Sequence, residues 1–195
     1  MHKTEREQYA KLNDLSEKGG IVIFGCGEDK AIPACELCQA FAVNDKVHNR
    51  SFGELSIQNA VNAYKESVAP LDPETLFLHI GEADIDFFEE NPAEFDNLYR
   101  KLILQVKKDN RKCRIAVVSL KNDENDSVIE NMNKHLKFIA ESEQCEYGDI
   151  ANKRVWNPKA MRESVSFVYT IGFDHPLHIK RPLCDLVKIL FCYDA

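Results

Sequence analysis

The sequence has 195 residues and lacks any apolar run near the ~20 residues that a membrane-spanning helix requires. The stretch from Met1 to Lys18 is charged throughout and lacks the apolar core of a signal peptide. Clustered basic residues, which phosphate binding needs, are also missing, and the net charge is −7. These absences predict a cytoplasmic protein that binds neither membranes nor nucleic acid.

The seven cysteines do not complete a metal site or a disulfide framework. An odd number of cysteines without an export signal predicts reduced thiols. Cys35 and Cys38 have CxxC spacing, but no second CxxC or pair of histidines completes four zinc ligands. We interpret both as buried structural cysteines. We expect no metal and no cofactor.

Repeats and low-complexity linkers are absent as well, and apolar strands alternate with helical patterns along the whole chain. The predicted strands are 21–24, 47–49, 76–80, 115–120 and 145–150. The predicted helices are 2–17, 31–42, 56–68, 127–142 and 179–192, with another that begins at Asn91 and Pro92. This alternation predicts a three-layer α/β/α sandwich with a central parallel sheet of about five strands, similar to flavodoxin.

We place this domain at residues 21–195, after an N-terminal helical extension at 1–20. The sequence leaves open whether the extension packs on the domain or on a partner. It also leaves the oligomeric state open.

The first predicted strand runs into the turn Gly25-Cys26-Gly27, at the edge of the sheet where ligands usually bind. The same glycines could begin a dinucleotide-binding fingerprint. That fingerprint needs a third glycine where Lys30 stands, and an acidic residue about 20 positions later, near Asp45. A nucleotide-binding Rossmann-like domain is therefore one alternative.

Four short blocks resemble those of the SGNH (GDSL-like) hydrolase family, and they occur in the same order. Gly25–Gly27 takes the place of the family's Gly-Asp-Ser, and Asn49–Gly53 resembles the second block. Leu78–Asp84 resembles the third block, and Asp174–His178 the fourth. Asn131 and Asn133, in the predicted helix after the fourth strand, are also similar to the family pattern. The resemblance implies an SGNH-hydrolase fold and descent from enzymes that hydrolyse esters with a Ser-His-Asp triad.

The catalytic residues of that family are largely replaced in this chain. The serine position holds Gly27, and the third-block asparagine, an oxyanion donor in the family, is Ala83. The aspartate position holds His175, with Asp174 displaced by one residue, whereas His178 matches. We therefore do not expect ordinary Ser-His-Asp hydrolysis. Whether Asp174 or His175 supports His178 is open.

The resemblance thus implies a non-catalytic pseudoenzyme that keeps its crevice for a small-molecule ligand, such as a carbohydrate or an acyl group. The positions expected to bind that ligand are Gly27, Asn49, Gly53 and Ala83.

A divergent esterase or acyl hydrolase is the other interpretation, with Cys26 as a thiolate nucleophile, His178 as its base and Asp174 as support. A thiol in a loop that leads into a helix can have a lowered pKa. Adjacent side chains in a turn point in different directions, however, which argues against Cys26. Ser51, in the second block, is a further candidate, but no base for it is evident.

Acidic residues follow the first and third predicted strands, namely Glu28, Asp29, Glu82, Asp84 and Asp86. They could converge on a cation, but carboxylates are also favourable near helix N-termini. We prefer the second explanation, because the chain has no loop of spaced Asp and Asn ligands. We interpret His79, within the third strand, as a core histidine whose hydrogen bonds are satisfied.

Overall fold

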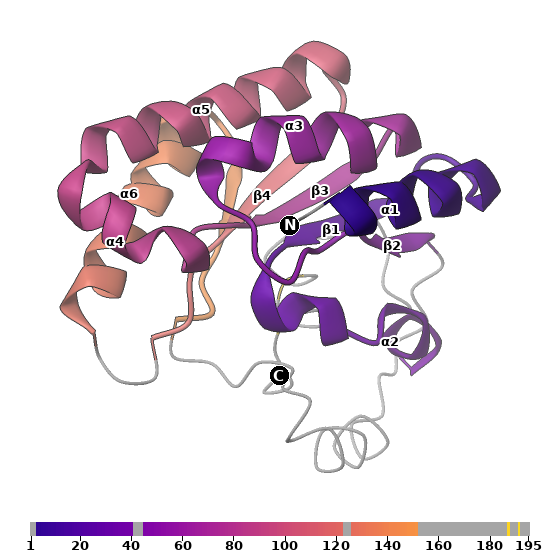
Figure 1. Cartoon of the computed structure of the whole chain (residues 1–195), viewed down its shortest axis with the longest axis horizontal. Helices are drawn as coiled ribbons and strands as arrows, with labels where there is room; N and C mark the ends of the chain where they lie inside the picture. The colour runs from indigo at the N-terminus through magenta and orange to yellow at the C-terminus, as the bar shows by residue number, and fades with distance from the viewer. Residues whose placement is uncertain (1–2, 41–44, 123–125, 152–186, 188–190, 192–195) are drawn as a thin grey trace.

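A computed structural model describes residues 3–40, 45–122, 126–151, 187 and 191. Its centre is a sheet of five parallel strands in the order β2-β1-β3-β4-β5 (Figure 1). The strands are β1 (Ile21–Gly25), β2 (Val47–Asn49), β3 (Thr75–His79), β4 (Arg114–Val118) and β5 (Glu146–Gly148). The predicted α/β fold with a central parallel sheet is confirmed.

Helices connect the strands. The α-helices are α1 (Lys3–Leu15), α2 (Ala34–Ala40), α3 (Ile57–Ser67), α4 (Ile85–Glu90), α5 (Pro92–Asp109) and α6 (Ser127–Ser142). The described residues also form the short 3₁₀ turns η1 (Gly27–Ala31), η2 (Ala69–Leu71) and η3 (Glu82–Asp84). Helix α3 packs against both α1 and α5, and α6 packs against α5 (Figure 1).

The central strands are buried on both faces, which is why β1 and β3 are nearly continuous apolar runs. Side chains alternate between the two faces of a strand. Val22 and Phe24 belong to the large core that also contains residues of α3, α5 and α6. On β3, Phe77 packs edge-on against Phe191, with 5.7 Å between the ring centroids.

The segment after β1 differs from the predicted helix at 31–42. It forms the turn η1 first, and α2 begins only at Ala34, so that Pro33 precedes the helix instead of lying in its first turn. Ile32 is extended, with φ −60° and ψ 116°, because a residue before proline is disfavoured in the helical region. The turn η1 therefore follows the strand directly, at the sheet edge.

Helix α4 was not predicted, since a six-residue helix is too short to show a helical period. The interpretation of Cys35 as buried is wrong: its side chain is exposed on α2. The side chain of Cys38 lies outside the described part of the chain. So does the predicted helix at 179–192, apart from Val187 and Phe191.

The N-terminal helix α1 packs on the rest of the chain. The ring of Tyr9 meets Phe52 edge-on, with 5.3 Å between centroids. Asn13 donates a hydrogen bond to the Ser67 carbonyl at 3.0 Å and accepts one from buried Arg50 at 3.0 Å. These contacts join α1 to α3 and to the loop after β2; the domain boundary at residue 20 stays a prediction.

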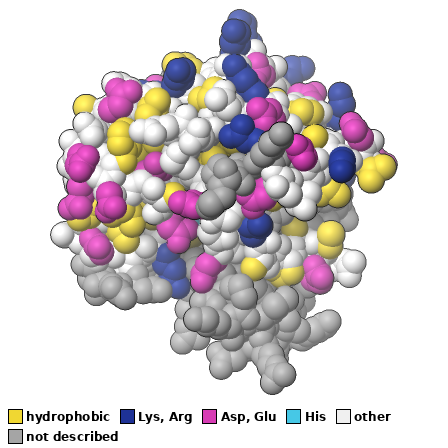
Figure 2. All heavy atoms as spheres, in the orientation of Figure 1, with side chains coloured by type: hydrophobic (Ala, Val, Ile, Leu, Met, Phe, Trp, Pro, Cys, Tyr) yellow, Lys and Arg dark blue, Asp and Glu magenta, His cyan; other side chains and the backbone are white. Residues whose placement is uncertain are grey.

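On the face in Figure 2, acidic side chains are spread from the left edge across the centre to the right, whereas basic ones are concentrated along the upper edge. Helix α5 carries Glu94 in its first turn and Lys107 and Lys108 in its last. This arrangement complements the helix dipole. Among the described helices, none combines the length and hydropathy that crossing a bilayer would need.

The buried side chain of Asn133, on α6, holds the chain just beyond β4. Its Oδ1 accepts from the Leu120 N–H at 2.7 Å, and its Nδ2 donates to the Leu120 carbonyl at 2.8 Å. The amide thus satisfies both backbone groups of a buried residue at the sheet edge.

Replacing Asn133 with alanine leaves those two backbone groups without partners, and each unsatisfied buried group costs about 1–3 kcal/mol. We expect Asn133→Ala to lower the free energy of unfolding in urea by at least about 2 kcal/mol. Asn131→Ala removes the same side chain from an exposed position on the same helix, and should change stability by less than about 0.5 kcal/mol. Equal losses in the two variants would contradict this role.

Candidate functional site

The carboxyl ends of β1 and β3 meet at one edge of the sheet. The two strands pair in parallel, with Gly25 opposite His79. The turns that follow them, η1 and η3, are therefore brought together. In open α/β sheets this edge is the usual place for a ligand.

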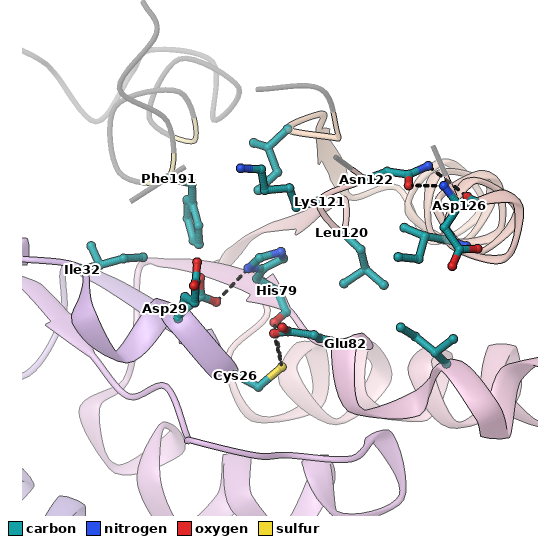
Figure 3. Close-up of a pocket in the computed structure, with 14 residues that line it drawn as sticks. Cys26, Asp29, Ile32, His79, Glu82, Leu120, Lys121, Asn122, Asp126 and Phe191 are labelled. Atoms are coloured by element: carbon teal, nitrogen blue, oxygen red, sulfur yellow. Dashed lines mark hydrogen bonds and ion pairs between the residues drawn. The ribbon is translucent and has the colours of Figure 1, made fainter. Parts of the chain in front are cut away.

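A cavity of about 360 Å³ lies at this edge (Figure 3), within the ~300–1,000 Å³ that is typical of small-molecule sites. Its walls come from the turns after β1 and β3, the loop after β4 and the start of α6. The lining residues are Cys26, Glu28, Asp29, Ile32, His79, Glu82, Ile85, Leu120, Lys121, Asn122, Asp126, Ile129, Ile150 and Phe191. The wall combines apolar side chains with carboxylates, an imidazole and an ammonium group.

Cys26 lies in the wall of this cavity but is only 4% exposed. Its Sγ is 3.9 Å from the His79 carbonyl and 3.9 Å from Glu82 Oε2. Burial, followed by the charges of Asp29 and Glu82, raises the pKa of the Cys26 thiol. This direction is opposite to the lowered pKa expected for a thiol at a helix start. A protonated thiol is a poor nucleophile, so the geometry argues against nucleophilic attack by Cys26.

At Gly27, the position that matches the serine of the SGNH family, the space beside the backbone is filled by a side chain from another turn. Gly27 has a positive φ of 61°, a backbone conformation that residues other than glycine rarely adopt. A Cβ built there would overlap an oxygen of Glu82 and lie 3.1 Å from its Cδ. The Glu82 carboxylate, from the turn after β3, thus fills the space that a side chain at residue 27 would use.

A histidine–aspartate pair forms one side of the cavity (Figure 3). His79 Nδ1 lies 2.7 Å from Asp29 Oδ2, and Asp29 is only 7% exposed. A side chain at Gly25 would collide with this carboxylate, so the glycine provides its space. Burial opposes the charged imidazole, but the Asp29 carboxylate, with Glu82 and the Ser119 carbonyl, raises the pKa of His79 overall.

The interpretation of His79 as a satisfied core histidine holds for only one of its nitrogens. Nδ1 is paired with Asp29, whereas Nε2 is buried and has no hydrogen-bond partner among the described residues. His79 also lines the cavity. It is therefore a residue of the candidate site as well as of the core.

The second block, Asn49–Gly53, lies outside the cavity, and its hydrogen bonds connect it to the η1 turn and to α1. Asn49 Nδ2 donates to the Asp29 carbonyl at 2.7 Å, and Asn49 Oδ1 accepts from Ser51 N–H at 3.0 Å. The Gly53 N–H, an oxyanion donor by resemblance, donates to Glu5 Oε1 on α1 at 3.2 Å. Neither Asn49, Ser51 nor Gly53 is among the residues that line the cavity. Their place beside a ligand stays a prediction. The hydrogen bond from Asn49 to the Asp29 carbonyl stabilises the η1 turn.

In the third block, Ala83 is exposed to solvent, whereas the next residue, Asp84, is buried in the core. Ala83 is exposed and does not line the cavity. Asp84 is buried, and its two carboxylate oxygens accept from Ile57 N–H at 3.1 and 2.9 Å. Asp84 thus caps the start of α3, as the helix-dipole explanation of the acidic residues predicts.

The structure brings together Cys26, Asp29, His79 and Glu82. Asp174 and His178 lie outside the described residues. Sequence reasoning grouped Asp29 with Glu82, as acidic residues that follow the first and third strands, but it left out His79, because the strand register that aligns Gly25 with His79 is not visible in sequence. No group of three or more metal-ligating side chains is placed to hold an ion in the ranges that the structure describes.

Comparison with known proteins supports the fold assignment. No protein-family profile matches the chain, and no curated protein does. Solved structures do match. A protein provisionally described as a platelet activating factor from Streptococcus pneumonia has a TM-score of 0.65 at 19% identity, over 81% of this chain and 78% of that one. A GDSL-like lipase from Bacteroides thetaiotaomicron has a TM-score of 0.57 at 13% identity, over 78% and 81%.

An acetyl xylan esterase also matches, with a TM-score of 0.57 at 15% identity, over 67% of this chain and 77% of that one. At such identities the likeness shows the fold alone. The chain has an SGNH/GDSL hydrolase-like fold, as the four sequence blocks predicted.

The cap formed by Asp84 predicts an unusual pH dependence of stability. Burial raises the pKa of Asp84 to about 6, above the value of about 3.9 for an exposed carboxyl. The native state therefore binds more protons than the unfolded state between about pH 4 and 6, and this group lowers stability as pH rises through that window.

The substitution Asp84→Asn keeps an acceptor for the Ile57 N–H but removes the charge. The unfolding free energy of the variant, relative to that of the unchanged protein, should therefore increase by about 1–3 kcal/mol between pH 4 and pH 7. Urea unfolding at both pH values measures this difference. Asp86→Asn, at an exposed neighbour, is the control and should show no such growth. A gap that is the same at both pH values would refute the effect.

Proposed function

We propose that this chain binds a small neutral ligand, an acylated carbohydrate or a related acyl ester, and that it does not use the serine chemistry of SGNH hydrolases. The observation that carries the proposal is at Gly27. No serine is present there, and the Glu82 carboxylate takes the space that a serine side chain would need. The cavity beside it remains large enough for a small ligand.

The lining suits a ligand with hydroxyl groups. The carboxylates of Glu28 and Glu82 can accept hydrogen bonds, and the Lys121 ammonium can donate them. Ile32 and Phe191 offer apolar surface for the face of a sugar ring or an acyl chain. The acetyl xylan esterase among the structural neighbours points to the same ligand class.

The alternative of nucleotide binding has less support. Four carboxylates line the cavity, from Glu28, Asp29, Glu82 and Asp126. They would repel the phosphates of a nucleotide. The turn after β1 also lacks the third glycine that would allow a pyrophosphate to approach the backbone.

Hydrolysis of 4-nitrophenyl acetate tests whether Cys26 and His178 act as nucleophile and base in ester hydrolysis. We expect Cys26→Ala and His178→Ala each to hydrolyse this ester at the rate of the unchanged protein, because a buried protonated thiol cannot serve as nucleophile. A working general base would contribute about 100-fold or more. A fall of about tenfold or more in His178→Ala would restore the esterase interpretation.

Ligand binding is tested with acetylated xylobiose, followed by saturation-transfer NMR at increasing concentration. We expect saturable binding that Ile85→Trp weakens at least about tenfold, since an indole would fill part of a cavity lined by Ile85. Gln58→Trp, at an exposed position on α3, is the control and should bind like the unchanged protein. Loss of affinity in both variants, or in neither, would count against this cavity.

A further inference from the structure

Three of the polar side chains that line the cavity lie at the carboxyl ends of the neighbouring strands β1 and β3. They are Asp29, His79 and Glu82, which come from the turns after β1 and β3 and from the last residue of β3. In Figure 3 the Glu82 carboxylate lies near both Cys26 and His79, and Asp29 approaches the imidazole from the other side.

His79 has the geometry of an oriented proton donor. Asp29 binds its Nδ1 at 2.7 Å, which fixes the ring and favours its protonated form. Its Nε2 is buried and makes no hydrogen bond of good geometry in the described part of the chain, although the Ser119 carbonyl also favours the protonated ring. A buried donor without a partner is costly, and native proteins keep few of them outside functional sites. An oxygen atom of a bound ligand would satisfy it.

Glu82 has the geometry of a base that can reach water. Glu82 is exposed to solvent and lines the cavity. Its carboxylate lies where the side chain of a serine at residue 27 would be. Its carboxylate contacts the Cys26 thiol at 3.9 Å, which is too long to engage the carboxylate strongly. Its negative charge also acts on His79, whose pKa it helps to raise.

We infer that Glu82 and the Asp29–His79 pair form an acid–base centre that hydrolyses a small carboxylic ester by direct attack of water. The inference rests on the proposed function in one respect, which is that the ester binds in this cavity. It adds a reaction that needs neither serine nor cysteine as nucleophile.

In the reaction, Glu82 takes a proton from a water molecule while the water oxygen forms a bond to the ester carbonyl carbon. The π electrons of the C=O bond move to the carbonyl oxygen, and they return to form the double bond again when the alcohol oxygen leaves. The tetrahedral intermediate then collapses, and the bond from that carbon to the alcohol oxygen breaks. The bonding electrons go to the alcohol oxygen, which receives the proton from His79 Nε2. Asp29 stabilises the imidazolium before the transfer. Glu82 returns a proton to solvent and His79 regains one, so the sum is ester plus water giving acid plus alcohol.

Two probe esters of similar size separate the two roles. The leaving group of 4-nitrophenyl acetate departs without help from an acid, whereas that of 4-nitrobenzyl acetate is a basic alkoxide and needs a proton. Glu82→Gln should slow both esters about 100-fold, the smaller end of the usual effect of a general base. Asp29→Asn and His79→Gln should slow the benzyl ester at least about tenfold more than the phenyl ester.

Asp86→Asn removes an exposed carboxylate outside the cavity and is the control, with both rates unchanged. The intact mass of the protein during turnover gives an independent readout, and it should show no acetyl adduct. An acetylated protein would overturn direct water attack. Equal effects of Asp29→Asn on the two esters would overturn the role of His79 as acid.

Binding of 4-nitrobenzyl acetamide, which is not readily hydrolysed, separates this inference from the proposed function. If the amide binds in the cavity but Glu82→Gln leaves both ester rates unchanged, the acid–base centre is wrong and ligand binding stands. If neither the amide nor acetylated xylobiose binds, both proposals fail.

Discussion

The parallel pairing of β1 with β3 is the constraint on which the site depends. Its register sets Gly25 opposite His79, and the missing side chain at residue 25 leaves space for the Asp29 carboxylate. A charged pair in such a buried place is strong only when its geometry is good, because both groups have left water. Here the two strand ends and the η1 turn supply that geometry at 2.7 Å.

The candidate site lies at the sheet edge where α/β folds usually bind ligands, and the part of it that the structure describes contains no serine nucleophile. Gly27 has no nucleophile, and the neighbouring Cys26 is a buried thiol with a raised pKa. A carboxylate from the next strand, Glu82, fills the vacant space. A shared fold places ligands at the same sheet edge, but the side chains there decide the chemistry. The likeness to esterases therefore describes the scaffold, and Asp29, His79 and Glu82 must be judged on their own geometry.

Several residues that resemble family motifs support the scaffold from outside the cavity. Asn49 holds the carbonyl of Asp29, Asn133 holds both backbone groups of Leu120, and Asp84 caps α3. Each one satisfies backbone groups in a turn that would otherwise be buried without partners. Such residues fix the shape of the sheet edge from outside the cavity.

The sequence by itself determined the strands and the longer helices, because apolar runs and helical spacing are local patterns of burial. It also indicated the fold, through four blocks in order, and the absence of serine at residue 27. Short elements such as α4 and the turn η1 escaped prediction, since they are shorter than the periods that reveal helices. The pairing of Asp29 with His79, and the approach of Glu82 to Gly27, were decided only by tertiary structure. Both bring together residues about 50 positions apart, and strand register, which local sequence does not encode, sets that contact.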